Sequence, residues 1–261
     1  MHLLTAAAVW LLLPVPSQDS IPAGLRCLEA AYPDAVARIS ATSLTLVDGT
    51  VIPWDDGAEK DLAARLAAPD LEDQMATPYP AGATWAGPPG PGADPGRVRH
   101  DGFFRGVYGA NRRAVAAKLV TVPWMPKTTK KKVRVTTVGG VHDRVLAISR
   151  ELDRLPKTLR RYAMEPSSFN WRTIKGTDRL SAHSFGIAID VGVKDSNYWR
   201  WDLRKGVVGI PEWRNRIPME IVGIFERHGF IWGGKWSHYD TMHFEYRPEL
   251  LHPLCVGGAT P

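Results

Sequence analysis

Two short stretches of the chain carry side chains that could bind a metal ion and act on a substrate. One is S-A-H-S-F-G-I-A-I-D, which contains His183 and Asp190, and the other is D-T-M-H-F-E, which contains Asp240 and His243. Three nitrogen or oxygen ligands together with an acidic base are what a hydrolytic zinc site requires. The two stretches therefore predict a metal centre, provided that folding brings them together.

The first stretch is predicted to leave a loop and enter a strand. Residues 187–193 alternate so that their isoleucines and valines share one core face, and Asp190 lies on the other face between two small residues. That arrangement leaves space above the carboxylate for a metal or a ligand, although a plain surface aspartate fits this segment equally well. His183 precedes Asp190 by an odd number of positions, so a bend at Gly186 is needed to bring both to one face.

The second stretch is predicted to be a strand that follows a turn. His243 and Glu245 share one face, while Phe244 and Tyr246 point to the core. Asp240 precedes His243 by three positions, so a turn must place it beside the metal without making it an obligatory ligand. The alternative for Asp240 is a turn-forming or capping residue.

The combined pattern S-x-H-x-x-G-x-A-x-D and D-x-M-H-F-E resembles the zinc D,D-peptidase family. That family includes D-Ala-D-Ala carboxypeptidases, vancomycin-resistance D,D-dipeptidases and phage L-alanyl-D-glutamate endolysins. F-N-W-R-T-I-K-G-T-D-R-L precedes the first stretch, and H-G-F-I-W-G-G-K-W-S-H-Y-D leads into the second and is similar to the endolysin-like branch. The resemblance covers roughly residues 141–250.

The resemblance implies a role for each of these residues. It implies that His183, Asp190 and His243 are the zinc ligands and that Asp240 is the general base. Because the family has an arginine that contacts the substrate or the developing oxyanion, it also implies that role for Arg172.

Two alternatives remain open at the level of sequence. Arg179 lies close to Arg172 where the alignment is loose, and Arg172 as a plain surface residue stays possible. The implied function is a zinc metallopeptidase that hydrolyses peptidoglycan stem peptides containing D-amino acids, as an endopeptidase or a D,D-carboxypeptidase. The alternative is a non-catalytic, zinc-stabilised module of the same fold that binds wall or protein ligands, which would not need an acid at Asp240.

Composition and charge constrain the partners. The chain has 261 residues, a globular composition and a formal net charge of +6, a balance that favours an anionic surface such as an acidic wall polymer. The one dense basic run, residues 127–134, leads into a strand-like alternation and is typical of a lysine-protected edge strand, with polyanion binding as the alternative. No nucleic-acid-binding motif accompanies the charge, so we expect a peptidoglycan peptide as partner and no nucleic acid.

The N-terminus and the cysteines indicate export. Residues 1–17 are apolar, lack lysine and arginine, and are too short to span a bilayer, which is typical of a signal peptide. Cys27 and Cys255 are the only cysteines, and an even count in an exported chain favours a disulfide, although two free thiols remain the alternative. We expect a periplasmic or secreted bacterial monomer without stable membrane insertion.

The order of the predicted elements indicates an α+β fold. The resemblance implies a small antiparallel sheet flanked by helices, as in hedgehog and D,D-peptidase domains. We predict a signal peptide (1–17), an N-terminal accessory region packed on the catalytic domain (18–125), a zinc peptidase domain (126–256) and a flexible tail (257–261). Further predictions are a hairpin around Asp48 and Gly49, a short helix near Leu62 and Leu66, a loop over residues 75–99, and helices over residues 112–120, 141–155 and 218–228.

Some aromatic and histidine residues are further candidates for the site. Core packing is the expected role of each tryptophan in the C-terminal half. Trp232 and Trp236 bracket a pair of glycines just before the second stretch, and they are the best candidates among them to line a cleft. His228 is expected to serve as a helix C-terminal residue. His238 is a candidate for a supporting hydrogen bond or for a donor to the transition state.

Overall fold

The computed structural model describes residues 21–256 apart from 83–84, 86, 89 and 204–210, so the predicted signal peptide and C-terminal tail lie outside the described residues. Helices and three small antiparallel sheets alternate along the chain, which confirms the α+β prediction. The helices are α1 (Ala23–Ala31), α2 (Leu62–Ala67), α3 (Leu71–Met75), α4 (Asp101–Tyr108), α5 (Arg112–Ala116), α6 (Val141–Arg154), α7 (Lys157–Arg160), α8 (Trp199–Leu203), α9 (Met219–Arg227) and α10 (Pro253–Val256). The strands are β1 (Val36–Ile39), β2 (Ser43–Leu46), β3 (Val51–Pro53), β4 (Leu119–Pro123), β5 (Lys132–Thr136), β6 (Ala188–Asp190), β7 (Phe230–Trp232) and β8 (His243–Tyr246).

The sheet that carries both predicted stretches has the strand order β6-β8-β7, with β8 in the centre. Its register places Asp190 opposite His243, so two residues far apart in sequence become direct neighbours. Every residue of β7 and β8 is buried, as expected of strands that are covered on both faces.

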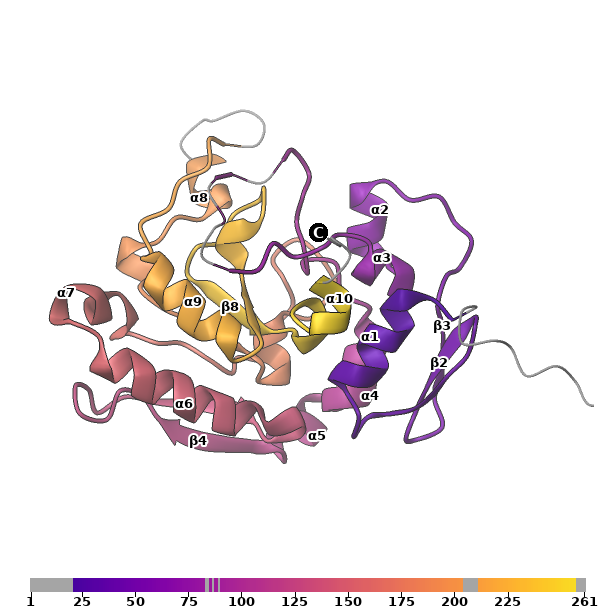
Figure 1. The fold of residues 1–261 in the computed structure, drawn as a ribbon, viewed down its shortest axis with the longest axis horizontal. Helices are drawn as coiled ribbons and strands as arrows, with labels where there is room; N and C mark the ends of the chain where they lie inside the picture. Colours follow the sequence, from indigo (N-terminus) through magenta and orange to yellow (C-terminus); the bar gives the residue numbers. More distant parts are fainter. Residues whose placement is uncertain (1–20, 83–84, 86, 89, 204–210, 257–261) are drawn as a thin grey trace, which may run out of the picture.

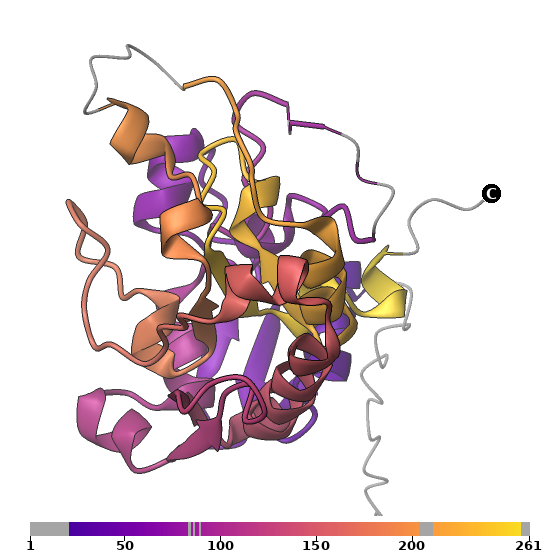
Figure 2. The same ribbon diagram turned by 90° about the vertical axis from the view of Figure 1, so that its left-hand side faces the viewer.

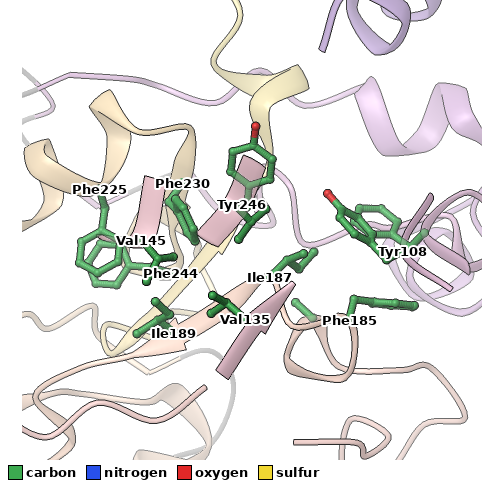
Figure 3. Close-up of a cluster of buried hydrophobic side chains, with 14 of the residues drawn as sticks. Tyr108, Val135, Val145, Phe185, Ile187, Ile189, Phe225, Phe230, Phe244 and Tyr246 are labelled. Carbon is green, nitrogen blue, oxygen red and sulfur yellow. The ribbon is translucent and has the colours of Figure 1, made fainter. Parts of the chain in front are cut away.

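Helices α6 and α9 pack over this sheet. The buried positions of α6 include Val141, Val145, Ile148 and Leu152, whose spacing matches the predicted helical stripe. Helix α9 begins after Pro218 and ends before a glycine in a left-handed conformation, as predicted. Figure 3 shows how side chains from α6, α9 and the three strands meet in one aromatic and aliphatic cluster.

The N-terminal region folds against the rest of the chain. It contributes α1 to α5, the three-stranded sheet β1-β2-β3 and strand β4, and Figure 1 places α1 beside α10 near the C-terminus. The Tyr32 hydroxyl donates to Glu249 Oε2 at 2.7 Å, and Cys27 is bonded to Cys255. Figure 2 shows the same indigo and purple elements lying behind the yellow C-terminal strands. The bond between Cys27 and Cys255 confirms the disulfide that the cysteine count predicted.

Several predicted elements are confirmed and a few boundaries are wrong. The hairpin at Asp48 and Gly49 joins β2 to β3, and the short helix near Leu62 is α2. The helix predicted over residues 112–120 ends instead at Ala116, because the β-branched residues that follow form β4 and pair with β5. Val193, predicted to face the core, is 42 % exposed because the chain leaves the strand at a left-handed Gly192.

Candidate metal centre

A short 3-10 turn, Ala182–Phe185, positions His183. Gly186 follows with φ of 70° and returns the chain to β6, as the sequence predicted. A Cβ atom at position 186 would lie 2.5 Å from a methyl group of Leu119, so the turn is closely packed as well as left-handed. The turn brings His183 Nε2 to 3.1 Å from Asp190 Oδ1, while its Nδ1 lies 2.7 Å from the Ser168 carbonyl oxygen.

The strand pairing between β6 and β8 positions His243. Its Nδ1 lies 3.0 Å from Asp190 Oδ1, and its Nε2 lies 3.0 Å from Glu245 Oε2. Glu245 is fully buried and also accepts hydrogen bonds from Arg99 Nη1 and Arg247 Nη1, at 2.9 and 3.1 Å. Arg99 and Arg247 therefore fix the carboxylate that in turn orients the imidazole ring.

The donor set of His183, Asp190 and His243 fits a zinc ion. One ligand atom from each residue lies within 4.8 Å of the other two. Each imidazole has an acceptor at its outer nitrogen, the Ser168 carbonyl or the Glu245 carboxylate, so the other nitrogen can present a lone pair to a metal. The other ligand clusters within the described residues consist of carboxylates alone and lack imidazole.

The protonation state of Asp190 suits the same role. Burial by itself would raise the pKa of this carboxyl group, but the charges and hydrogen bonds of His183 and His243 outweigh it and hold the pKa well below its usual range. Asp190 is consequently an ionised carboxylate between two imidazoles. To bind a metal, each imidazole would give up the proton that it shares with Asp190. The resulting set of two neutral imidazoles and one carboxylate favours zinc over calcium or magnesium.

Asp240 lies in the tight turn before β8, as the spacing predicted. Its N–H donates to the Gly233 carbonyl at 3.0 Å, and its own carbonyl accepts from the His243 N–H at 3.1 Å. A Cβ atom at position 233 would lie 2.7 Å from the Asp240 carbonyl oxygen, which explains why a glycine is found there. The turn holds the backbone of Asp240 and leaves its side chain free to face the cavity.

The Asp240 carboxyl group has the properties of a proton acceptor. Its Oδ1 is buried, and among the described residues it has no hydrogen-bond partner. Burial raises its pKa to about 6; the charge of Asp190 adds to this effect, while those of His243 and Arg97 oppose it. A carboxyl group with a pKa near neutrality and an unused oxygen can take a proton from a water molecule or a substrate.

One cavity contains all these groups. Asp240 and the three candidate ligands line it, and Arg172 and Trp236 lie in its wall as predicted. Trp232 does not: its side chain is fully buried in the core, and its Nε1 donates to the Thr241 carbonyl at 2.8 Å. Trp232 therefore has the core role expected of the tryptophans in general, and its candidacy as a cleft residue is wrong. Arg172 is exposed, which leaves room for a ligand at its guanidinium group.

The sequence did not indicate the contribution of the N-terminal region to this cavity. Arg97 and Arg99 line its wall, and Asp94 Oδ2 accepts from His238 Nδ1 at 2.7 Å, so Asp94 fixes the ring of a cavity residue. His238 thus lies at the site with a buried carboxylate behind it. His228 does not line the cavity. It is the C-terminal cap residue of α9, and its Nε2 lies 2.6 Å from Glu151 Oε1 of α6. Only the charge of the D-P-G-R-V-R segment could have suggested these residues.

Two imidazoles, a carboxylate and a nearby unpaired acid in one cavity are the groups that mononuclear metal hydrolases use. Residues 175–246 match a family model described as D-alanyl-D-alanine carboxypeptidase, a zinc peptidase family. The matched segment contains His183, Asp190, Asp240 and His243, and it ends before the C-terminal helix; Arg172 precedes it. No curated protein and no solved structure matches the chain. The family resemblance of the two stretches is confirmed over this segment, and the match indicates a peptidase.

Proposed function

We propose that the protein is a zinc-dependent peptidase that hydrolyses peptide bonds in peptidoglycan stem peptides containing D-amino acids, as an endopeptidase or a D,D-carboxypeptidase. The observation that carries this proposal is the convergence of His183 Nε2 and His243 Nδ1 on Asp190, in the same cavity as the unpaired Asp240 oxygen. The family match over residues 175–246 supports the substrate class.

The three ligands would hold the zinc, and each has a defined support. Ser168 and Glu245 orient the two rings, and Asp190 contributes the negative charge. When bound, zinc supplies a Lewis acid that polarises a peptide carbonyl and lowers the pKa of water to about 7 in well-tuned sites.

The residues of this chain then carry the proton and the developing charge. Asp240 accepts a proton from the attacking water and returns it to the nitrogen of the leaving amine, so its carboxylate is restored at the end of the cycle. We assign Arg172 to the oxyanion that forms at the carbonyl carbon, because it is a cation in the cavity wall. A module that only bound its ligand would have no use for an unpaired acid at Asp240.

The remaining parts of the proposal concern the fold and the location of the protein. We propose the hedgehog and D,D-peptidase fold for residues 126–256, with residues 18–125 as an accessory region and with export of a monomer. The boundary lies between β4 and β5, which pair with each other. The disulfide is compatible with an oxidising compartment. Within the described ranges, each helix is too short or too polar to span a bilayer.

Mass spectrometry of muropeptides tests the proposal. Purified protein with zinc should release new peptide fragments from isolated peptidoglycan, and the mass of the products identifies the bond. Removal of zinc with a chelator should stop the release, and addition of zinc should restore it. Unchanged muropeptides after digestion with zinc-loaded protein would reject the peptidase assignment in favour of a binding module.

A further inference from the structure

Arginines from two distant parts of the sequence meet in the wall of the cavity. Arg97 comes from the N-terminal region, outside the segment that matches the family, and Arg179 comes from the loop that leads to His183. Arg179 Nη2 donates to the carbonyl oxygen of Arg97 at 3.0 Å, so the two residues form one continuous wall. Arg172 and Arg200 add further positive charge to the same cavity.

The carboxylates of the protein do not balance this charge. Glu245 pairs with Arg99, and Asp94 is shared between His238 at 2.7 Å and Arg97 Nη1 at 3.3 Å. Within the part of the chain that the structure describes, Arg179 has no carboxylate at ion-pair distance. The wall therefore holds at least one guanidinium group, that of Arg179, which has no ionic partner among the described residues and is available to an anionic ligand.

The environment of Arg179 makes this imbalance costly without a ligand. Burial lowers the pKa of its guanidinium group to about 9, and the positive charges of Arg99 and Arg97 add to the effect. Glu245 and Asp101 oppose the shift, but they are already engaged by Arg99 and Arg105. Desolvated like charges that crowd in a cavity are a recurrent feature of functional sites, because an anionic ligand relieves their repulsion.

We propose that Arg97 and Arg179 form a carboxylate-binding subsite, through which the N-terminal region selects peptides that carry a free carboxylate beside the scissile bond. This inference rests on the proposed peptidase function and narrows its substrate class. The guanidinium fork matches the two oxygens of a carboxylate. The Arg97 guanidinium carbon lies 5.6 Å from the centre of the Trp199 ring, a contact that restricts the side chain before a ligand arrives.

Calorimetric binding to zinc-loaded Asp240→Asn protein tests the subsite without turnover. The probes are a stem pentapeptide with free carboxylates, the same peptide with a C-terminal amide, and the same peptide with its D-glutamate carboxylate amidated. Amidation of one of these positions should weaken binding about tenfold or more, as expected for loss of a charge-assisted hydrogen-bonded pair. The amide that has this effect identifies which carboxylate the subsite holds.

Substitution of either arginine tests the subsite from the side of the protein. In the Asp240→Asn background, Arg97→Gln or Arg179→Gln should weaken binding of the peptide with free carboxylates about tenfold. Each variant should also lose most of the difference in affinity between that peptide and its amidated form. Arg113→Gln is the matched control, because it removes one positive charge from the exposed face of α5 and should leave binding unchanged. Arg97→Lys keeps the charge but not the fork, and we expect partial discrimination to remain.

Equal affinities for the free and both amidated peptides would overturn the inference, and this comparison needs no arginine variant. Inorganic phosphate competing more strongly than acetate, in a manner abolished by Arg179→Gln, would overturn the choice of a carboxylate. Failure of the wild-type protein to hydrolyse peptidoglycan would reject the proposed function, while the binding comparison would still decide the subsite.

Discussion

At the scale of single residues, the two histidines differ in the ring nitrogen that they present. His183 faces Asp190 with Nε2, and His243 faces it with Nδ1, because their outer nitrogens meet a backbone carbonyl and a buried carboxylate respectively. Each partner fixes a tautomer and a ring orientation. The proposed metal centre thus depends on residues that would not touch the ion.

Asp240→Asn should separate chemistry from metal binding. The amide keeps the size of the side chain but cannot accept a proton, so turnover should fall by a factor of roughly 10²–10⁴. Zinc content and thermal midpoint should stay close to wild type, because Asp240 is held by its backbone hydrogen bonds. All three quantities should be measured on one preparation.

The comparison variant for Asp240 is Asp190→Asn, which should lose zinc as well as turnover. A zinc-loaded Asp240→Asn protein with near-wild-type turnover would contradict the role of Asp240. Loss of stability without loss of turnover would instead identify Asp240 as a turn-forming residue.

Glu245→Gln should weaken the metal site from outside it. The substitution removes the charge that orients His243 and leaves Arg99 with a weaker partner, and loss of such a supporting carboxylate costs about 10–100-fold in metal affinity. Zinc affinity can be measured by competition with a chromogenic chelator. Glu151→Gln is a matched control, since it alters another carboxylate that contacts a histidine, His228, in a different part of the fold. Equal zinc affinities in the two variants would refute the supporting role of Glu245.

At the scale of elements, the turn between the 3-10 segment and β6 connects two of the candidate metal ligands, His183 and Asp190. Gly186 has a left-handed backbone and packs against Leu119 of β4, so this turn links the β4-β5 hairpin to the ligand-bearing sheet. The N–H of Thr136 in β5 also donates to the Gly186 carbonyl at 3.0 Å. The position of His183 therefore depends on a second sheet that holds no ligand.

Gly186→Ala should destabilise the protein and weaken zinc binding together. A left-handed alanine costs about 1–2 kcal/mol, and overpacking against Leu119 adds about 1–3 kcal/mol. Gly176→Ala is the matched control: its φ is 82°, but a Cβ atom there meets nothing within 4 Å, so only the backbone cost applies. Urea unfolding and zinc affinity of both variants would measure the difference. Equal effects of the two substitutions would show that packing at the turn does not matter.

At the scale of the whole molecule, the N-terminal region and the sheet that carries Asp190 and His243 share one hydrophobic core. The bond between Cys27 and Cys255 closes a separation of 228 residues and attaches α1 to α10. Tyr32, Arg99 and Asp94 add buried polar contacts between the same two parts of the chain. The cavity wall is thus built by both, and the N-terminal region contributes two of its arginines, Arg97 and Arg99.

Replacing both cysteines by serine should lower the free energy of unfolding by about 2–5 kcal/mol. The disulfide reduces the conformational entropy of the unfolded chain, and this effect is largest when the bonded residues are far apart in sequence. The zinc affinity should change little, because neither cysteine lines the cavity. Urea unfolding of the variant and of the wild type, with and without a reducing agent, checks the prediction. Two free thiols in a non-reducing peptide map of the wild type would contradict it.

The sequence by itself determined the ligand-bearing elements, because short-range chemistry defines them. The alternation around Asp190, the bend at Gly186 and the turn before His243 follow from local spacing, and the structure places all three as expected. Helices α6 and α9 were predictable for the same reason, since their apolar spacing and glycine stop are local.

Only the tertiary structure decided what surrounds these elements. Asp94, Arg97 and Arg99 occupy a proline- and glycine-rich loop with no periodicity, and nothing local could place that loop beside His238 or Glu245, more than a hundred positions away. Trp232 and Trp236 flank the same glycines, yet one lies in the core and the other in the cavity wall, because burial depends on what packs above each side chain. Long-range packing, which sequence spacing does not encode, therefore determines the charge and the walls of the site.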